Sequence, residues 1–236
     1  MLNDLGQPVG EPLPGWTPPP APTADVLEGE WCRLERLDPD RHADDLFAAD
    51  RADTDGASWT YLPYGPFATI GDYRAWLDPV AAAEDPRFYA VLDTDPLARA
   101  QSAGRAVGVL SLMRIQPAAG SIEVGHVHLS PWLQRRRGAT QAQHLLMSQA
   151  FGLGYRRYEW KCNALNAPSI RAAERLGFTF EGTFRQAQVV RGRNRDTSWY
   201  SILDREWPQV DARLRAWLAP ENFDDQGRQH TALTAG

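Results

Sequence analysis

The stretch SPWLQRRRGATQA, residues 130–142, decides how the fold of this chain is interpreted. Three consecutive arginines and a glycine lie between an apolar run at 122–129, which predicts a β-strand, and an amphipathic pattern that predicts a helix beginning near Ala139. Backbone N–H groups in the first turn of a helix favour anions, as does the helix dipole, and neighbouring arginines add charge-assisted hydrogen bonds. The sequence therefore predicts a phosphate-bearing ligand at this turn.

A second strand and a short helix are expected after this turn. The apolar face of the intervening helix is formed by Ala142, Leu145, Leu146, Ala150 and Leu153. Tyr158, Trp160 and Cys162 then alternate with charged residues, which is the period of a strand, and Asn166 predicts the cap of a short helix. Because strand, turn, helix and strand follow in this order, the two strands are expected to lie parallel.

The rest of the chain predicts a mixture of helices and strands. Asp38-Pro39 is typical of a helix start, and Thr69 followed by Asp72 forms the pattern of a capping box. Further strands are expected over 31–36, 88–92, 106–115 and 178–203, the last range holding two strands joined by an arginine-rich turn at 191–196. The strands from residue 88 to 129 have short connections and are expected to form an antiparallel meander.

The segment WTYLPYGPF, residues 59–67, combines four aromatic residues with two prolines and a glycine. It has too many helix and strand breakers for a regular element and is too apolar for a solvated loop. We expect it to line a pocket or to pack over the core.

Composition limits both the organisation and the class of the protein. The 236 residues divide into a proline-rich arm at 1–28, a domain at 29–205 and a helical extension at 206–236. The net charge of −5 argues against a general affinity for nucleic acid, and no apolar run approaches the roughly 20 residues of a membrane helix. Since no secretory signal is visible either, a cytoplasmic protein without nucleic-acid or membrane partners is expected.

The two cysteines, Cys32 and Cys162, each occupy an apolar position of an expected strand. They are far apart in sequence, which suits buried thiols better than a disulfide or a metal pair. No metal site is predicted.

Several motifs together resemble the GNAT acyltransferase superfamily, and within it the RimJ/RimL-like N-acetyltransferases. They are Gln134-Arg135-Arg136-Arg137-Gly138-Ala139, Thr140 and Ala142, Asn166-x-x-Ser169, Ala173-x-x-Leu176-Gly177-Phe178, and Glu181-Gly182. The first matches the superfamily's pyrophosphate loop except that Arg137 stands where a central glycine is usual. The resemblance covers roughly residues 28–205.

The resemblance implies an α/β (mixed α+β) GNAT fold: a central, mostly antiparallel sheet of six or seven strands, with one splayed parallel strand pair and helices on both faces. It implies acetyl-CoA as co-substrate, lying where the parallel strands separate. The residues expected to hold it are Val127, His128 and Leu129 through their backbone, Gln134, Arg135, Arg136, Arg137, Gly138, Ala139 and Thr140 at the pyrophosphate, and Asn166 with Ser169 near the pantetheine. Asn166 is also expected to cap its helix.

Acyl transfer from a thioester to an amine needs a base for the amine's proton and a proton for the departing thiolate. Glu123, on the strand beside the expected acyl position, is the first candidate for the base. His126 and His128 are alternatives, expected on the opposite face of the strand by alternation. Ser169 is the candidate proton donor, or else a residue that bonds a free backbone N–H. No Ser-His-Asp pattern is visible, so direct transfer in a ternary complex is favoured.

The acceptor is expected to be a small-molecule amine or a protein N-terminal amine, entering between the 59–67 segment and the 184–199 hairpin. Protein N-terminus, amino acid, polyamine and aminoglycoside all remain open, as do a longer acyl donor such as succinyl-CoA and a CoA-binding module without catalysis. Arg185, Arg191, Arg193 and Arg195 are consistent with a solvated hairpin or with attraction of an acidic acceptor. A homodimer is also compatible with the resemblance.

Overall fold

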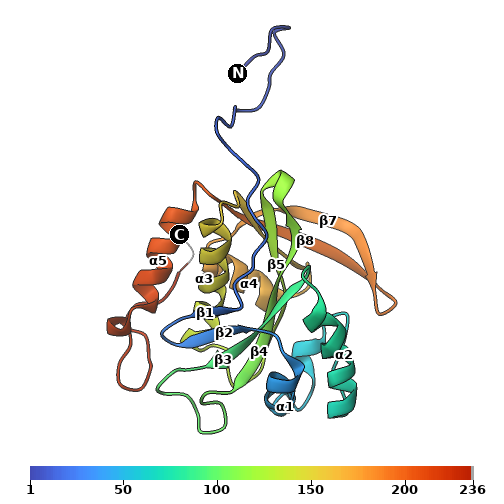
Figure 1. Ribbon diagram of the computed structural model, residues 1–236, viewed down its shortest axis with the longest axis vertical. Helices are drawn as coiled ribbons and strands as arrows, with labels where there is room; N and C mark the ends of the chain where they lie inside the picture. Colours follow the sequence, from blue (N-terminus) through green and yellow to red (C-terminus); the bar gives the residue numbers. More distant parts are fainter. Residues whose placement is uncertain (235–236) are drawn as a thin grey trace.

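The computed structural model describes residues 1–234, which form one eight-stranded sheet with helices on both faces (Figure 1). The strands are β1 Val26–Glu28, β2 Cys32–Arg36, β3 Arg87–Asp93, β4 Ala106–Gln116, β5 Ser121–Leu129, β6 Arg157–Asn163, β7 Thr179–Val190 and β8 Arg193–Leu203. The α-helices are α1 Pro39–Asp50, α2 Ile70–Ala82, α3 Arg137–Gly152, α4 Ala167–Leu176 and α5 Trp207–Leu218. Their order in the sheet is β1-β2-β3-β4-β5-β6-β8-β7.

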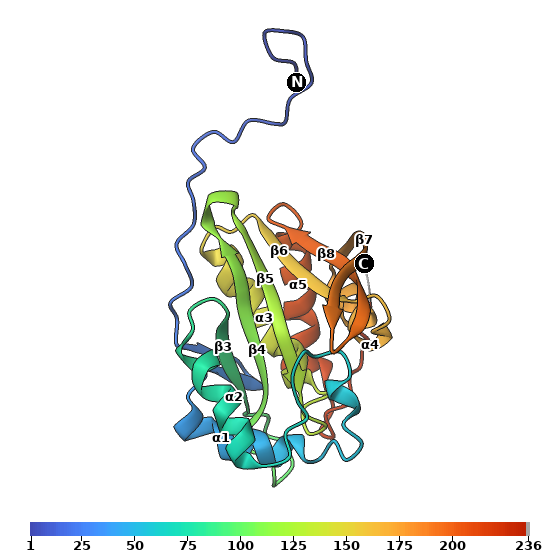
Figure 2. The ribbon, with the colours of Figure 1, turned by 90° about the vertical axis from the view of Figure 1, so that its right-hand side faces the viewer.

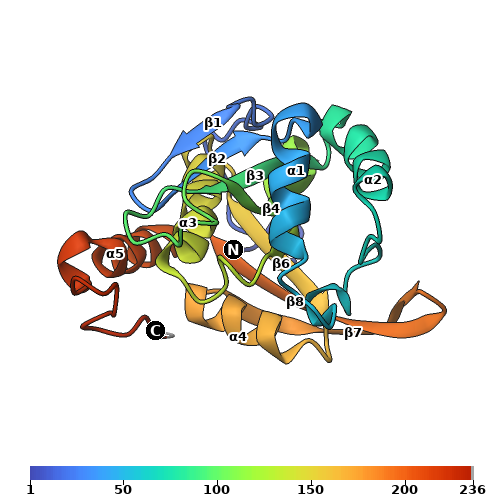
Figure 3. The ribbon, with the colours of Figure 1, turned by 90° about the horizontal axis from the view of Figure 1, so that it is seen from below.

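The sheet separates two hydrophobic cores. The helices α3, α4 and α5 cover one face and α1 with α2 covers the other, as Figure 3 shows from below. Ile122 and Val124 of β5 point into the first core, while Phe88 and Val109 point into the second. Alternation therefore directs Glu123, which lies between Ile122 and Val124, to the face opposite the first core.

The expected fold is confirmed, with one difference in strand number. Asp38 caps α1 with Pro39 in its first turn, and Thr69 accepts a hydrogen bond from the backbone N–H of Asp72 at the start of α2. The sheet has eight strands rather than six or seven, because the short segment Val26–Glu28 pairs with β2 and adds an edge strand inside the region expected to be an arm. Both cysteines are free and buried, as expected.

The arginine-rich turn is shorter than predicted. Only Arg191 and Gly192 form it, both with left-handed backbone (φ 50° and 71°), and β8 begins at Arg193. Two consecutive left-handed residues give the tight turn whose twist matches a β-hairpin, so the strands pair up to Val190 and Arg193. The consequence is that Arg195 belongs to a strand and not to a solvated loop.

The parallel pair separates after four residues. β5 and β6 are in register from Ser121 opposite Arg157 to Val124 opposite Trp160, and the ladder then ends although both strands continue. β5 remains paired with β4 on its other edge. The edge of β5 beyond Val124 therefore faces β6 across a gap without ladder hydrogen bonds.

A β-bulge in β5 changes which way its histidines point. Opposite β5, Ser111 pairs with Gly125 and Val109 with His128, so two residues of β5 oppose Leu110. His126, one of the two, has a left-handed backbone (φ 52°). By simple alternation, His126 and His128 are expected on the face opposite Glu123, and this prediction is wrong. The extra residue brings His128 to the same face as Glu123 and directs His126 toward the aromatic rings of the second core.

The N-terminal residues extend away from the body before the chain reaches the sheet (Figure 2). Residues 1–15 are exposed, whereas Pro19 and Pro22 are buried and Trp16 is half-buried. At the end of this segment Arg87 donates hydrogen bonds to the carbonyl of Thr23 and to the carboxylate of Asp25. Within residues 1–234, no helix is long and apolar enough to cross a membrane.

Candidate active site

The gap between β5 and β6 opens into a cleft of about 420 Å³. Its floor comes from both separating strands, and the segment at 58–63, the start of α4 and the β7–β8 hairpin supply its walls. Two contacts hold these walls together: the hydroxyl of Tyr61 donates to the carbonyl of Leu165 at 3.0 Å, and Arg191 at the hairpin tip donates to the carbonyl of Tyr64 at 2.5 Å. The 59–67 segment thus lines the cleft with some residues and packs with others, such as Trp59, in the second core.

Glu123 lies in this cleft in contact with two cations. Its Oε2 is 2.8 Å from Nζ of Lys161 and 3.2 Å from Nε of Arg114, and Lys161 also contacts Glu159 at 2.7 Å. Burial raises the pKa of the Glu123 carboxyl above its usual value, while the hydrogen bond from Lys161 opposes that shift. Glu123 therefore lies near the reacting position, but its carboxylate is already engaged.

His126 also lines the cleft and forms no ion pair within the described chain. Its Nδ1 lies 3.0 Å from the hydroxyl of Tyr64, and its ring packs 4.9 Å from that of Phe88, centroid to centroid. Burial lowers the pKa of this imidazole below the usual histidine value. His126 is therefore neutral at pH 7, the state in which an imidazole accepts a proton.

The side chain of His128 points behind the cleft and stacks on Trp59 with centroids 3.7 Å apart. Its Nε2 lies 2.8 Å from Oγ of Ser58 and its Nδ1 lies 3.4 Å from Oδ1 of Asp50. Burial lowers the pKa of His128 to about 4 and raises that of Asp50 to about 7. The side chain of His128 is thus a buried structural group, and His128 is not among the residues that line the cleft.

Ser169 and Asn166 face the cleft from the start of α4. Asn166 caps the helix, its Oδ1 accepting from the backbone N–H of Ser169 at 3.2 Å. Oγ of Ser169 accepts a hydrogen bond from the indole of Trp160 at 3.0 Å. Because the Ser169 oxygen is used as an acceptor, its own O–H hydrogen is available to donate.

The N-terminus of α3 follows directly on the exposed residues Gln134 and Arg135. The side chain of Gln134 donates to the carbonyl of Leu129 at 2.8 Å, which ties the turn to the end of β5, and Arg135 has a left-handed backbone (φ 61°). Arg136 is the N-cap but makes no capping bond, since a guanidinium has no acceptor atom. Its guanidinium donates to the carbonyl of Leu97 at 2.7 Å. The first turn of α3 therefore has no side-chain cap from its N-cap residue, which suits it to an anion.

Arg137 does not point toward that turn. Its guanidinium forms two hydrogen bonds of 2.7 Å with Asp95 and lies 3.5 Å from the ring centroid of Trp31. The residue is the first of α3, with an ordinary helical backbone, so its position does not require glycine. The substitution at the usual glycine position is thus accommodated by directing the side chain into the body of the protein.

The next three residues form the buried side of the same turn. A Cβ on Gly138 would lie 2.9 Å from the carbonyl oxygen of Trp31, so glycine permits the close approach of α3 to β2. The Ala139 N–H donates to the carbonyl of Arg136 at 3.1 Å, and the hydroxyl of Thr140 accepts from Arg175 at 2.9 Å. Val127 lines the cleft on β5, about ten residues earlier in the chain.

Sequence reasoning missed Lys161, Thr197 and Trp199 as cleft residues, and it gave Arg195 only as one of four hairpin arginines. Lys161 was one of the charged residues that alternate along an expected strand, yet only 7% of its side chain is exposed and it lies 3.7 Å from the ring of Trp199. Arg195, Thr197 and Trp199 line the cleft from β8. Their alternate spacing is a signal for one strand face, but it becomes visible only once the hairpin turn is known to end at residue 192.

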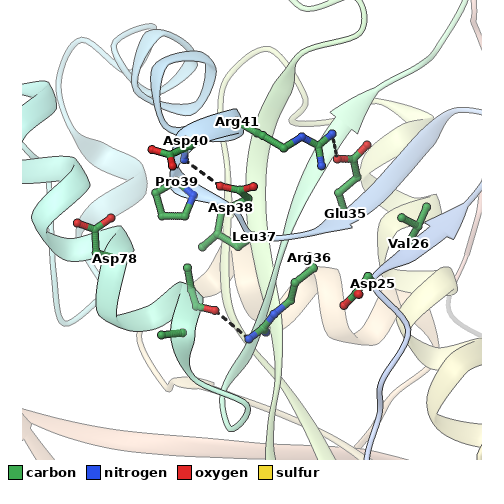
Figure 4. Close-up of a pocket in the computed structure, with 12 residues that line it drawn as sticks. Asp25, Val26, Glu35, Arg36, Leu37, Asp38, Pro39, Asp40, Arg41 and Asp78 are labelled. Carbon is green, nitrogen blue, oxygen red and sulfur yellow. Dashed lines mark hydrogen bonds and ion pairs between the residues drawn. The ribbon is translucent and has the colours of Figure 1, made fainter.

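A second hollow of about 570 Å³ lies elsewhere, between the start of α1, β2 and α2 (Figure 4). Its charged side chains largely satisfy one another: Arg41 contacts Glu35 at 2.5 Å, and Arg36 donates to the carbonyl of Ala81 at 2.9 Å. Asp38 is used as the cap of α1. Nη1 of Arg36 has no partner among residues 1–234, but this hollow does not adjoin the diverging strands, so the cleft beside β5 is the candidate active site.

A cleft between diverging parallel strands, beside an uncapped helix that follows one of them, defines the class of acyl-CoA-dependent acyltransferases with this fold. The family model of the acetyltransferase (GNAT) domain matches residues 32–179. The chain belongs to this family and is an acyl-CoA-dependent N-acyltransferase. No curated protein matches the sequence significantly.

Solved structures agree with this membership. A GCN5-related N-acetyltransferase from Brucella melitensis is 48% identical, with a TM-score of 0.88, and the match covers 94% of this chain and 97% of the other. A GNAT-family protein from Chromobacterium violaceum is 42% identical over 86% of this chain and 98% of its own, with a TM-score of 0.77. RimL, a ribosomal L7/L12 alpha-N-protein acetyltransferase in complex with coenzyme A, is 21% identical over 75% of this chain and 97% of its own, with a TM-score of 0.62, and shares the fold.

Proposed function

We propose that this protein transfers an acetyl group from acetyl-CoA to a primary amine by direct attack in the cleft between β5 and β6. The observation that carries the proposal is the loss of the β5–β6 ladder after Val124 and Trp160, which leaves one edge of β5 unpaired beside the cleft. An amide-containing chain laid along that edge would be bound by main-chain hydrogen bonds, as an added strand is. RimL and the immunity acetyltransferase MccE, with the same fold, bind coenzyme A and acetyl-CoA respectively.

The described residues fit coenzyme A. The first turn of α3 offers backbone N–H groups without a side-chain cap, and Arg135 is exposed beside it with no ion pair among the described residues. Such a turn suits a pyrophosphate. Acetyl-CoA would supply the activated acetyl thioester, and Asn166 and Ser169 lie on the side of the cleft that its pantetheine would reach.

We assign the base to His126 rather than to Glu123. His126 is neutral at pH 7 and makes no ion pair, whereas the carboxylate of Glu123 is held by Lys161 and Arg114. With Nδ1–H donating to the oxygen of Tyr64, the Nε2 lone pair of His126 is free to accept the amine's proton. Ser169 would donate its hydroxyl hydrogen to the departing thiolate.

Titration calorimetry with acetyl-CoA and a free-thiol assay over a panel of amines test the proposal. We expect binding of acetyl-CoA and amine-dependent thiol release. A variant with a side chain at the end of the paired ladder, Gly125→Leu, should weaken acetyl-CoA binding or turnover, since a Cβ there would already meet Met113. Absence of acetyl-CoA binding at high micromolar concentration would refute the function.

A further inference from the structure

One face of β8 presents three hydrogen-bond donors to the cleft without partners. Arg195, Thr197 and Trp199 alternate along the strand and line the cleft together. Nε of Arg195, Oγ1 of Thr197 and Nε1 of Trp199 are each buried, and none has a hydrogen-bond partner among residues 1–234. A buried donor that stays unpaired destabilises the fold, so three in a row point to a ligand that accepts hydrogen bonds.

The charged side chains of the cleft also favour a ligand with negative charge. Glu123 is the acidic residue among the cleft's lining groups, and it is paired with both Lys161 and Arg114. Arg195 forms no ion pair within the described chain, and its side chain is half-buried. Glu123 attracts the guanidinium of Arg195 from a distance, without an ion-pair contact among residues 1–234, so a ligand carboxylate would give this charge a direct partner.

The three donors of β8 lie away from the side of the cleft where the cofactor is expected. Asn166 and Ser169 lie at the start of α4, whereas Arg195 and its neighbours lie on the hairpin whose tip is joined through Arg191 to the 59–67 segment. The acceptor amine is expected to enter on the hairpin side. A cleft of about 420 Å³ has the size of a small-molecule site.

We infer that the acceptor is a small amine that carries a carboxylate, of the amino acid type, and that Arg195, Thr197 and Trp199 bind this carboxylate while the amine is acetylated. A planar guanidinium matches a carboxylate with two parallel hydrogen bonds, and a hydroxyl and an indole N–H add two more donors. The inference rests on the proposed function, since it names the substrate class of the same site. It makes Arg195 a determinant of specificity.

Matched acceptors test the inference by steady-state thiol release with saturating acetyl-CoA. Free amino acids are compared with their carboxamides, which keep the amine and the side chain but lack the carboxylate. The expected result is a kcat/KM at least tenfold higher for the carboxylate member of each pair. Arg195→Gln should lower kcat/KM for the carboxylate members by a factor of 10 to 100 through KM and leave the amides within a factor of two, with partial recovery in Arg195→Lys.

Arg193→Gln is the matched control, because Arg193 lies two residues away on the same strand, is exposed and does not line the cleft. It should leave both members of each pair unchanged. An acceptor panel without carboxylate preference, or an Arg195→Gln variant that lowers both members equally, would overturn the inference. A preference for phosphorylated amines over carboxylated ones would do so as well.

A binding measurement keeps the inference testable without turnover. N-acetylalanine and N-acetylalaninamide are titrated into the protein in the presence of coenzyme A, with wild type and Arg195→Gln compared. Tighter binding of N-acetylalanine, lost in Arg195→Gln, supports the carboxylate site even if no tested amine is acetylated. Equal binding of the two compounds contradicts it. Failure of acetyl-CoA to bind, by contrast, would count against the proposed function itself.

Discussion

At the scale of single residues, we assign the role of general base from the difference in charge state and contacts between His126 and Glu123. Both line the cleft, but one is a neutral imidazole beside Tyr64 and the other a carboxylate between two cations. Burial lowers the pKa of His126, so its accepting form persists at pH values somewhat below the ordinary histidine value near 6.5. The rate should therefore fall only when pH drops below that lowered pKa.

We predict that His126→Asn lowers kcat/KM about 100-fold or more and removes this acidic limb. Asparagine is chosen because it tolerates the left-handed backbone of this position (φ 52°) better than most residues. The measurement is kcat/KM from pH 5 to pH 9 for wild type, His126→Asn and Glu123→Gln. A limb that persists in His126→Asn and disappears in Glu123→Gln would assign the base to Glu123 instead.

A second residue-scale prediction concerns the pair formed by His128 and Asp50. The pKa of His128 falls from 6.5 to about 4 on folding, so its contribution to stability is lost as pH falls through that range. The pKa of Asp50 rises from 3.8 to about 7, so its contribution has the opposite sign and grows as pH falls. In the wild type the two effects of pH nearly cancel between pH 4 and pH 6.5.

The variant Asp50→Asn removes the effect of the Asp50 pKa shift on stability and leaves that of His128. The free energy of unfolding of this variant, relative to wild type, should therefore decrease by about 3 kcal/mol from pH 6.5 to pH 4. Urea denaturation at several pH values measures it. Asp44→Asn, on the same helix, is the control and should give a much smaller change with pH, because its ion pair with Arg74 is exposed to solvent. A flat difference for Asp50→Asn would contradict the raised pKa of Asp50.

At the scale of elements, the start of α3 is anchored by Arg137. This residue joins the helix to Asp95 in the loop after β3, to Trp31 before β2 and to Phe223 beyond α5. Burial raises the pKa of Asp95, but Arg137, the backbone N–H of Leu97 and the charge of Arg136 together outweigh this and hold the pKa below its usual value. Without the arginine, the carboxylate would be buried without its counter-ion.

We predict that Arg137→Ala lowers the free energy of unfolding by about 3–5 kcal/mol, the usual result of removing one partner of a buried pair. Denaturant unfolding measures the loss. Arg135→Ala, two residues earlier and exposed, should change stability by no more than about 0.5 kcal/mol. The double variant Arg137→Met/Asp95→Leu should be more stable than Arg137→Ala, and an equal or greater loss would show that the ion pair is not the cause.

At the scale of the whole molecule, the N-terminal segment is divided into two parts by its contacts. Residues 1–15 are exposed, whereas residues 16–25 lie against the body and end at the buried Arg87, which bonds to Thr23, Ala24 and Asp25. The two parts should therefore differ in their effect on stability.

Deletion of residues 2–15 should leave Tm unchanged within error, because no buried contact is lost. Deletion of residues 2–25 should lower Tm by roughly 5 °C or more, because Arg87 loses three of its partners. Thermal unfolding of the two truncated proteins checks this. Equal Tm values for both truncations would mean that the packed part of the segment contributes nothing.

The sequence by itself determined the elements that depend on local chemistry. The Asp38-Pro39 helix start, the Asn166 cap and the parallel arrangement of β5 and β6 follow from propensity, capping and chain order, which are properties of neighbouring residues. The same reasoning predicted the candidate ligand turn before α3, whereas the candidate catalytic strand, Ser121–Leu129, was implied by the resemblance to the GNAT superfamily.

Only the tertiary structure decided which side chains meet in the cleft. The direction of His126 depends on a bulge set by pairing with β4, and the position of Arg195 depends on a turn of two residues. Arg137 is paired with Asp95 across 42 positions of sequence, which removes its charge from the ligand turn. These outcomes rest on strand register and on long-range burial, and a one-residue shift in register reverses the face of every side chain that follows it.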